Sequence, residues 1–143
     1  MAIKTPLELV LDKTENEEQL MTERLEKAQA FIQQERQQLQ QLQEYSEEYA
    51  CKIQQQQTGW SAAQMGHYRS FLQQLHTAVN TQKVKVATAE ENTSHLRQQL
   101  MACRHKISVL SELIVEQKKN LQLEKDKVLQ KELDELAIRI SHR

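Results

Sequence analysis

Apolar residues recur along most of the chain at alternating intervals of three and four, the spacing that lines up side chains on one face of an α-helix. In the second half of the chain, one series of positions seven apart runs from Met65 to Val128, and nine of its ten members are apolar. Heptads sustained over this length predict helices that pack through a narrow apolar seam. The predicted seam positions of the second helix are Met65, Leu72, Val79, Val86, Thr93, Leu100, Ile107, Ile114, Leu121 and Val128, with Tyr68, Leu75, Gln82, Ala89, Leu96, Cys103 and Leu110.

Start and stop signals divide the pattern into two helices. Thr5-Pro6-Leu7-Glu8 reads as a capping box with proline at the first helical position, and Ser61 followed by Gln64 reads as a second. Between them, Gly59 is suited to the left-handed conformation that ends a helix. The sequence therefore predicts a single all-α coiled-coil domain over residues 1–143, with helices over about 6–56 and 62–140 and a turn over about 57–61.

The two heptad patterns mirror each other about the turn, as expected for an antiparallel hairpin. Facing residues in such a pair have numbers with a constant sum, and a sum of 121 brings the two seams together. It places Ile53 on Tyr68, Leu42 on Val79, Ile32 on Ala89, Leu25 on Leu96, Leu11 on Leu110 and Leu7 on Ile114. Polar residues also fall on seam positions, where we expect local weakness: Glu18, Glu35, Ser46, Gln82 and Thr93.

Composition and charge agree with a thin rod rather than a globular core. Charged residues make up 27% of the chain and aromatic residues only 4%, while Gly and Pro total three. Residues 1–50 carry five Lys/Arg against eleven Asp/Glu, and the remainder carries fourteen against nine, so the two helices attract modestly. No apolar stretch approaches 18 residues and no secretory signal is evident. Two cysteines are too few for a disulfide framework, which favours the cytoplasm.

One edge of the predicted hairpin is unusually aromatic. This aromatic edge carries Phe31, Gln38 and Tyr45 from the first helix and Phe71 and Ala78 from the second. Part of this edge and the adjoining seam residues form a stripe near the turn, with residues spaced four, three, four on both helices. The stripe consists of Gln38, Leu42, Tyr45 and Tyr49 on the first helix and of Phe71, Leu75, Ala78 and Gln82 on the second. The stripe either widens the core or forms an exposed contact patch for a partner.

The C-terminal part of the second helix extends beyond the start of the first. About 25 residues follow Ile114, and apolar residues continue there at helical spacing, including Leu129, Leu133, Leu136 and Ile140. Apolar residues without a partner in the hairpin predict a partner from elsewhere. A frayed tail and a homodimer formed through the tails are the alternatives.

Catalytic and cofactor chemistry has no support in the sequence. None of the five histidines has Cys or carboxylate neighbours in a closed metal-binding arrangement, and no Gly-rich phosphate loop occurs. Two helices are not expected to form a concave pocket, and basic residues do not cluster with aromatics as nucleic-acid binding requires. We therefore expect no enzyme activity, no cofactor, no metal and no nucleic acid.

The stripe and the tail together resemble the FliJ family of the bacterial flagellar type III export apparatus. The resemblance spans nearly the whole chain and lies in the Gly59-Trp60 turn, in the stripe and in the C-terminal segment. The matching residues are Gln38, Leu42, Tyr45, Tyr49, Tyr68, Phe71, Leu72, Leu75, Ala78, Val79 and Gln82, with Gln130, Lys131, Asp134, Glu135 and Ala137. The family often has histidine where this chain has Gln82, so this position departs from the pattern.

The resemblance implies a non-enzymatic stalk that enters the hexameric export ATPase, binds the cytoplasmic domain of the membrane export gate and escorts export chaperones. It implies a position in the cytoplasm, peripheral at the inner face of the cell membrane. The implied gate-binding patch is Gln38, Leu42, Tyr45, Tyr49, Phe71, Leu75, Ala78 and Gln82. The predicted ATPase-binding end is Leu129, Leu133, Leu136 and Ile140. The alternatives are a generic coiled-coil scaffold, tether or homodimer, the equivalent stalk of a virulence type III secretion system, and a dedicated chaperone for one secreted substrate.

Overall fold

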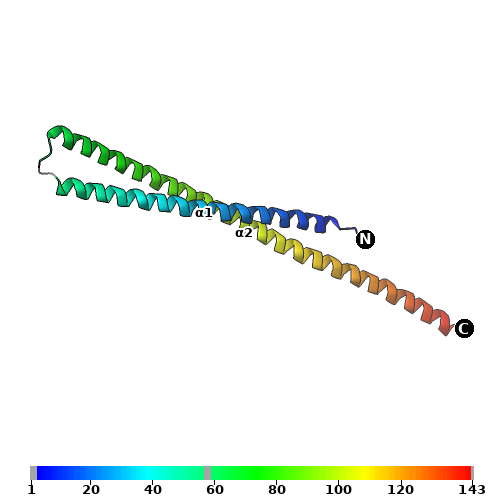
Figure 1. The fold of residues 1–143 in the computed structure, drawn as a ribbon. Coiled ribbons are helices and arrows are strands. Elements are labelled where there is room, and N and C mark those ends of the chain that lie inside the picture. The colour runs from blue at the N-terminus through cyan, green and yellow to red at the C-terminus, as the bar shows by residue number, and fades with distance from the viewer. Residues whose placement is uncertain (1–2, 57–58, 143) are drawn as a thin grey trace. The chain divides into compact units, whose positions relative to one another are not determined.

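Two long helices make up the protein in a computed structural model, which describes residues 3–56 and 59–142. Helix α1 spans Pro6–Gln55 and helix α2 spans Ala62–Ser141 (Figure 1). No strand occurs among the described residues, and the helices pack against each other, which confirms the predicted all-α class. Of the predicted turn, Gln57 and Thr58 lie outside the described residues.

Both helix starts carry the predicted capping boxes. The amide of Glu8 donates to Thr5 Oγ1 at 3.3 Å, and the amide of Thr5 donates to Glu8 Oε2 at 3.3 Å. At α2, the amide of Gln64 donates to Ser61 Oγ at 3.2 Å and the amide of Ser61 donates to Gln64 Oε1 at 3.0 Å. These bonds satisfy amides that have no partner within the helix, so each helix begins at a defined residue.

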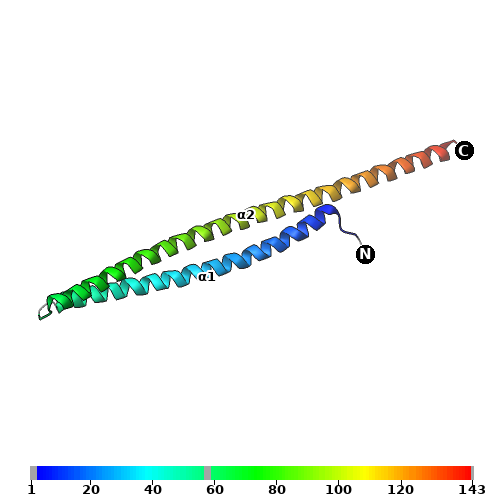
Figure 2. The same ribbon diagram turned by 90° about the horizontal axis from the view of Figure 1, so that it is seen from above.

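The chain divides into two compact units, each built from one segment of α1 and one of α2. Unit 2 comprises residues 21–99, and unit 1 comprises residues 1–20 and 100–143. In unit 2 the two segments run antiparallel on either side of the turn (Figures 1 and 2). Within unit 1, Glu18 pairs with Arg104 and Glu8 with Lys118, so these segments are antiparallel as well. The prediction of a single domain over residues 1–143 stays a prediction.

The core follows the predicted seam. Every buried residue that the structure describes in α2 occupies a predicted seam position, among them Val79, Val86 and Leu100. Burying a side chain of this size stabilises the fold by about 1.5–3 kcal/mol, so a single row of them sustains a long helix pair. Ile32 and Ile53 are the buried apolar residues described in α1.

The polar seam positions are accommodated by hydrogen bonds. Thr93 Oγ1 donates to the carbonyl of Ala89 at 2.9 Å. Thr14, which the seam analysis did not single out, is 2% exposed and donates to the carbonyl of Val10 at 2.7 Å. Among the described residues, no buried side-chain nitrogen or oxygen lacks a hydrogen-bond partner. These layers therefore carry no unpaired polar group, the main cost of polar side chains in a core.

Candidate partner-binding surfaces

Five of the six aromatic side chains of the chain form one continuous cluster in unit 2. The ring of Tyr49 lies 4.8 Å from that of Phe71 and 5.6 Å from that of Tyr68, measured between centroids. Tyr45 meets Phe71 edge to face at 6.5 Å, and Trp60 stacks on Tyr68 at 4.1 Å. Such ring pairs add about 0.5–1.5 kcal/mol each beyond simple burial, so the cluster stiffens the end of the hairpin near the turn.

Helix spacing and the turn together explain why these rings meet. Tyr45 and Tyr49 lie four residues apart, so they share one face of α1 with their rings 6.4 Å apart. Gly59 adopts a φ of 99°, which glycine tolerates without a steric penalty. This conformation precedes Trp60, whose ring lies flat on Tyr68 at an interplanar angle of 12°. The turn therefore extends the cluster beyond the seam.

Neighbouring rings also affect the chemistry of Tyr49. Burial among them raises the pKa of the Tyr49 phenol, and the adjacent phenols of Tyr68 and Tyr45 raise it further. A phenol is already neutral near pH 7 at its ordinary pKa, and the upward shift keeps Tyr49 uncharged to a higher pH.

The structure brings the eight predicted gate-binding residues together in unit 2 but differs in how much of each it exposes. Tyr45 is 49% exposed and Phe71 is 37% exposed, and Gln38 is exposed as well. Leu42, Tyr49 and Ala78 are half-buried, and Leu75 is buried. The accessible part of the set is therefore the two rings and the Gln38 side chain, and the rest is a partly covered apolar base.

Gln82 lies in the core rather than on the surface. It is 3% exposed, and its Nε2 donates to the carbonyl of Glu35 at 3.0 Å and also to the Glu35 carboxylate. With its amide committed to α1, Gln82 is placed to set the helix register and has no free face for a partner. Heptad position alone predicts a polar seam layer here, whereas the family resemblance predicts a contact residue.

The second predicted surface, the end of α2, stays helical as far as Ser141. Leu129, Leu133, Leu136 and Ile140 are each more than half exposed. Their spacing of four, three, four places them on one face of α2. Polar neighbours pair along the helix: Gln130 Nε2, for example, donates to Asp134 Oδ1 at 3.0 Å. All described residues from 115 onward are exposed, so no described residue covers this apolar stripe. An exposed apolar stripe of this kind is typical of a surface that binds a partner.

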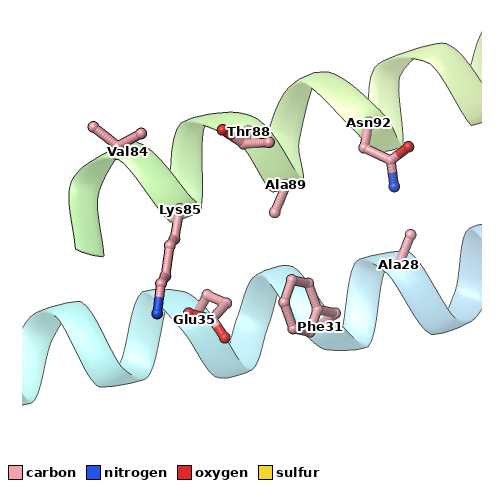
Figure 3. A pocket seen from close by; sticks show the side chains of 8 residues that line it. All are labelled: Ala28, Phe31, Glu35, Val84, Lys85, Thr88, Ala89 and Asn92. Atoms are coloured by element: carbon pink, nitrogen blue, oxygen red, sulfur yellow. The ribbon is translucent and has the colours of Figure 1, made fainter. Parts of the chain in front are cut away.

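Two grooves contradict the expectation that a helix pair forms no concave surface. The larger, about 600 Å³, lies in unit 2 between Phe31 and Glu35 of α1 and Val84 and Lys85 of α2, over Ala28 and Ala89 (Figure 3). The smaller, about 420 Å³, lies in unit 1 where α1 begins, beside Leu7, Leu113 and Leu121. A signal for the larger groove was present in the sequence, because Ala28 and Ala89 place small side chains on the seams of both helices and leave space between the helices unfilled.

The two cysteines differ in exposure. Cys51 is exposed in unit 2, whereas Cys103 is buried in unit 1, where its thiol donates to the carbonyl of Thr14 at 3.5 Å. Burial raises the pKa of the Cys103 thiol, and the nearby Glu17 and Glu18 carboxylates raise it further. The described residues contain no group of three or more His, Cys, Asp or Glu side chains placed to hold a metal ion.

Comparison with known proteins identifies the family. Residues 3–143 match the family model described as the flagellar FliJ protein. No curated protein matches the chain, and no solved structure does. Neither described helix contains a stretch that is both long and apolar enough to cross a membrane. The match covers nearly the whole chain, so the protein belongs to the FliJ family and is a component of the flagellar export apparatus.

Proposed function

We propose that the chain is a non-enzymatic link between two parts of the flagellar export apparatus, the hexameric export ATPase and the cytoplasmic domain of the membrane export gate. Family membership supports a role in the apparatus. The placement of two separate apolar surfaces supports a linking role, because one lies near the turn in unit 2 and the other at the end of α2 in unit 1. The gate would hold the protein at the inner face of the membrane, and the same chain would escort export chaperones.

The exposed pair of Tyr45 and Phe71 is the observation that carries the gate proposal. Both rings are accessible, yet they rest on Tyr49, so little side-chain freedom remains for a partner to immobilise. Rigid aromatic residues of this kind supply most of the binding energy in many interfaces. Leu42 and Ala78 extend the apolar base, and Gln38 borders it with a polar amide. We assign Leu75 and Gln82 a supporting role beneath this patch.

Substitution of the two exposed rings tests the gate proposal. Tyr45→Ala and Phe71→Ala should each weaken binding of the purified gate cytoplasmic domain by at least about tenfold, as expected of residues that dominate an interface. His76→Ala is the matched control and should bind normally, since residue 76 lies two positions from Ala78 and therefore on another face of α2. Circular dichroism checks that the helices persist. Normal binding by both ring variants would make the cluster purely structural.

The end of α2 is proposed to bind the ATPase through Leu129, Leu133, Leu136 and Ile140. The support is an exposed, regularly spaced apolar stripe on a helix that continues past the start of α1. Truncation after Val128 removes the whole stripe and should weaken ATPase binding while leaving gate binding intact. Unchanged ATPase affinity would remove the stripe from the mechanism.

A homodimer formed through the same stripe is the second candidate, since a second copy would also cover those leucines. The two candidates differ in solution mass. A linking subunit stays monomeric near 16.8 kDa until it meets the ATPase, whereas the homodimer doubles that mass on its own. Light scattering on the full chain separates them.

A further inference from the structure

The larger groove of unit 2 lies apart from the aromatic cluster and contains the sixth aromatic residue. Phe31 forms one wall of the groove and is 51% exposed. The chain has only six aromatic residues, so an exposed one is notable. Val84, also well exposed, stands on α2 across the groove. Figure 3 shows Ala28 and Ala89 directed into the space between the two helices. An exposed phenylalanine beside an unfilled apolar groove is a typical site for a partner's apolar side chain.

Small seam residues explain why the groove exists. Ala89 is buried and Ala28 half-buried, so both occupy seam positions without filling the space that a leucine would fill. Next to them, the hydrogen bond from Gln82 to Glu35 keeps the two helices in register. The groove is therefore held open by the backbone and by a neighbouring polar layer, and does not depend on a flexible loop.

The groove continues the aromatic edge. Phe31, Gln38 and Tyr45 follow each other at intervals of seven on α1, as do Phe71, Ala78 and Lys85 on α2. Residues seven apart on a helix stay on nearly the same face. At one end of this edge Tyr45 contacts Phe71, and at the other end Phe31 and Lys85 line the groove. Fourteen residues of α1 separate Tyr45 from Phe31, about 21 Å at helical rise.

Lys85 gives the groove a charge preference. Its side chain extends from α2 toward α1 at the groove mouth (Figure 3), and it forms no ion pair within the described part of the chain. The carboxylate of Glu35, which also lines the groove, keeps its charge but is bonded to the buried amide of Gln82 and forms no ion pair with Lys85. An available ammonium group next to an apolar groove favours a segment that carries an apolar side chain and a carboxylate close together.

We propose that this groove is a second anchor for the export gate, which binds it with an acidic and apolar segment while the ring pair of Tyr45 and Phe71 is engaged. The inference rests on the proposed gate function and extends that contact along the aromatic edge. Phe31 and Val84 clasp the apolar side chain, and Lys85 pairs with the neighbouring carboxylate. Two anchors on one rigid edge fix the orientation of the partner, which one anchor cannot do.

Binding of the purified gate cytoplasmic domain to the full chain tests this inference. Phe31→Ala should weaken binding at least about fivefold, since it removes one wall of the groove. Lys85→Glu should weaken it about fivefold at low salt, and the difference from wild type should shrink in 1 M NaCl because salt screens exposed charges. Lys83→Glu is the matched control, since it makes the same charge change two residues away and therefore on another face of α2. Both substituted residues are exposed, so the helices should persist.

The outcomes separate this inference from the function on which it rests. A wild-type chain that fails to bind the gate overturns both. Weakened binding by Tyr45→Ala, together with binding within about twofold of wild type for Phe31→Ala and Lys85→Glu, overturns the second anchor and leaves the gate function in place. Equal losses from Lys85→Glu and Lys83→Glu would indicate a general charge effect and would also overturn it.

Discussion

At the scale of single residues, position on the heptad decides whether a polar side chain holds the helices together or faces a partner. Gln82 and Gln38 share a residue type and a predicted patch, yet Gln82 is buried and bonded to Glu35 whereas Gln38 is exposed. The difference is one of geometry: Gln82 occupies a seam position of α2, and Gln38 lies beside the seam of α1. The same residue type therefore has a structural role in one case and an accessible surface in the other.

The buried amide of Gln82 leads to the first prediction. Gln82→Ala leaves a gap and removes the bonds to Glu35, so it should lower the free energy of unfolding by about 1–3 kcal/mol in urea denaturation. Gln82→Leu fills the space with apolar atoms and should come close to wild type, because the partly exposed Glu35 carboxylate can bind water instead. If Gln82→Leu folds normally yet loses gate binding as fully as Tyr45→Ala, Gln82 is a contact residue after all.

The cysteines give a second prediction at this scale. Iodoacetamide should label exposed Cys51 readily at pH 8 and Cys103 far more slowly, since Cys103 is buried and its thiol pKa is raised. Because the folded-state pKa is the higher one, the contribution of Cys103 to stability is present below pH 9 and is lost as the pH rises further. Mass spectrometry of the labelled peptides measures both rates. Equal labelling in the folded protein would show that unit 1 opens freely around Cys103.

At the scale of elements, two glycines with different backbone conformations show how the helices are delimited. Gly59 has a positive φ of 99° in the turn, whereas Gly66 lies within α2. Neither has a heavy atom within 4 Å of the position that a Cβ would occupy. Substitution at either site therefore tests backbone conformation alone, without a steric clash.

The two alanine variants should have opposite effects. Gly59→Ala forces a side chain into the left-handed region and should destabilise the fold by about 1 kcal/mol. Gly66→Ala removes backbone freedom from the unfolded chain and should stabilise it by about 0.5–1 kcal/mol. Thermal unfolding followed by circular dichroism measures both changes against wild type. A destabilising Gly66→Ala would contradict the open space beside Gly66 and would indicate a close packing contact at that position.

At the scale of the whole molecule, burial is distributed unevenly along α2. All described residues from 115 onward are exposed, whereas buried residues recur from Leu75 to Ile114. A helix that buries nothing contributes little to its own stability in water. The end of α2 is therefore the part of the chain that a partner can stabilise most.

Truncation after Val128 should consequently leave the rest of the fold intact. The helical signal should fall with the residues removed, while the thermal midpoint stays within about 3 °C of wild type, since the deleted residues are exposed. Measuring the midpoint over a range of protein concentrations provides the control. A full-length midpoint that rises with concentration, together with a truncated one that does not, would favour the homodimer over the linking subunit.

Local rules determined the helices, their caps, the seam and the glycine of the turn. These features depend on neighbours three, four and seven residues away, and such neighbours can be read directly from the chain. Tyr49 contacts the rings of Tyr68 and Phe71, which lie within about one helical turn of Leu72, the residue that the sum of 121 places opposite Tyr49. For the same reason, the aromatic edge was visible as a set of residues at helical spacing.

Tertiary structure alone decided which of those residues are accessible. The burial of Gln82 and Leu75, the exposure of Phe31 and the groove over Ala28 and Ala89 depend on how side chains from two helices share one layer. Burial of Thr14 also could not be predicted from periodicity, because this polar residue is fully buried only when its hydroxyl donates to a carbonyl of its own helix. Periodicity specifies which face of a helix turns inward. The volumes and hydrogen bonds of the facing helix determine how far each side chain is covered.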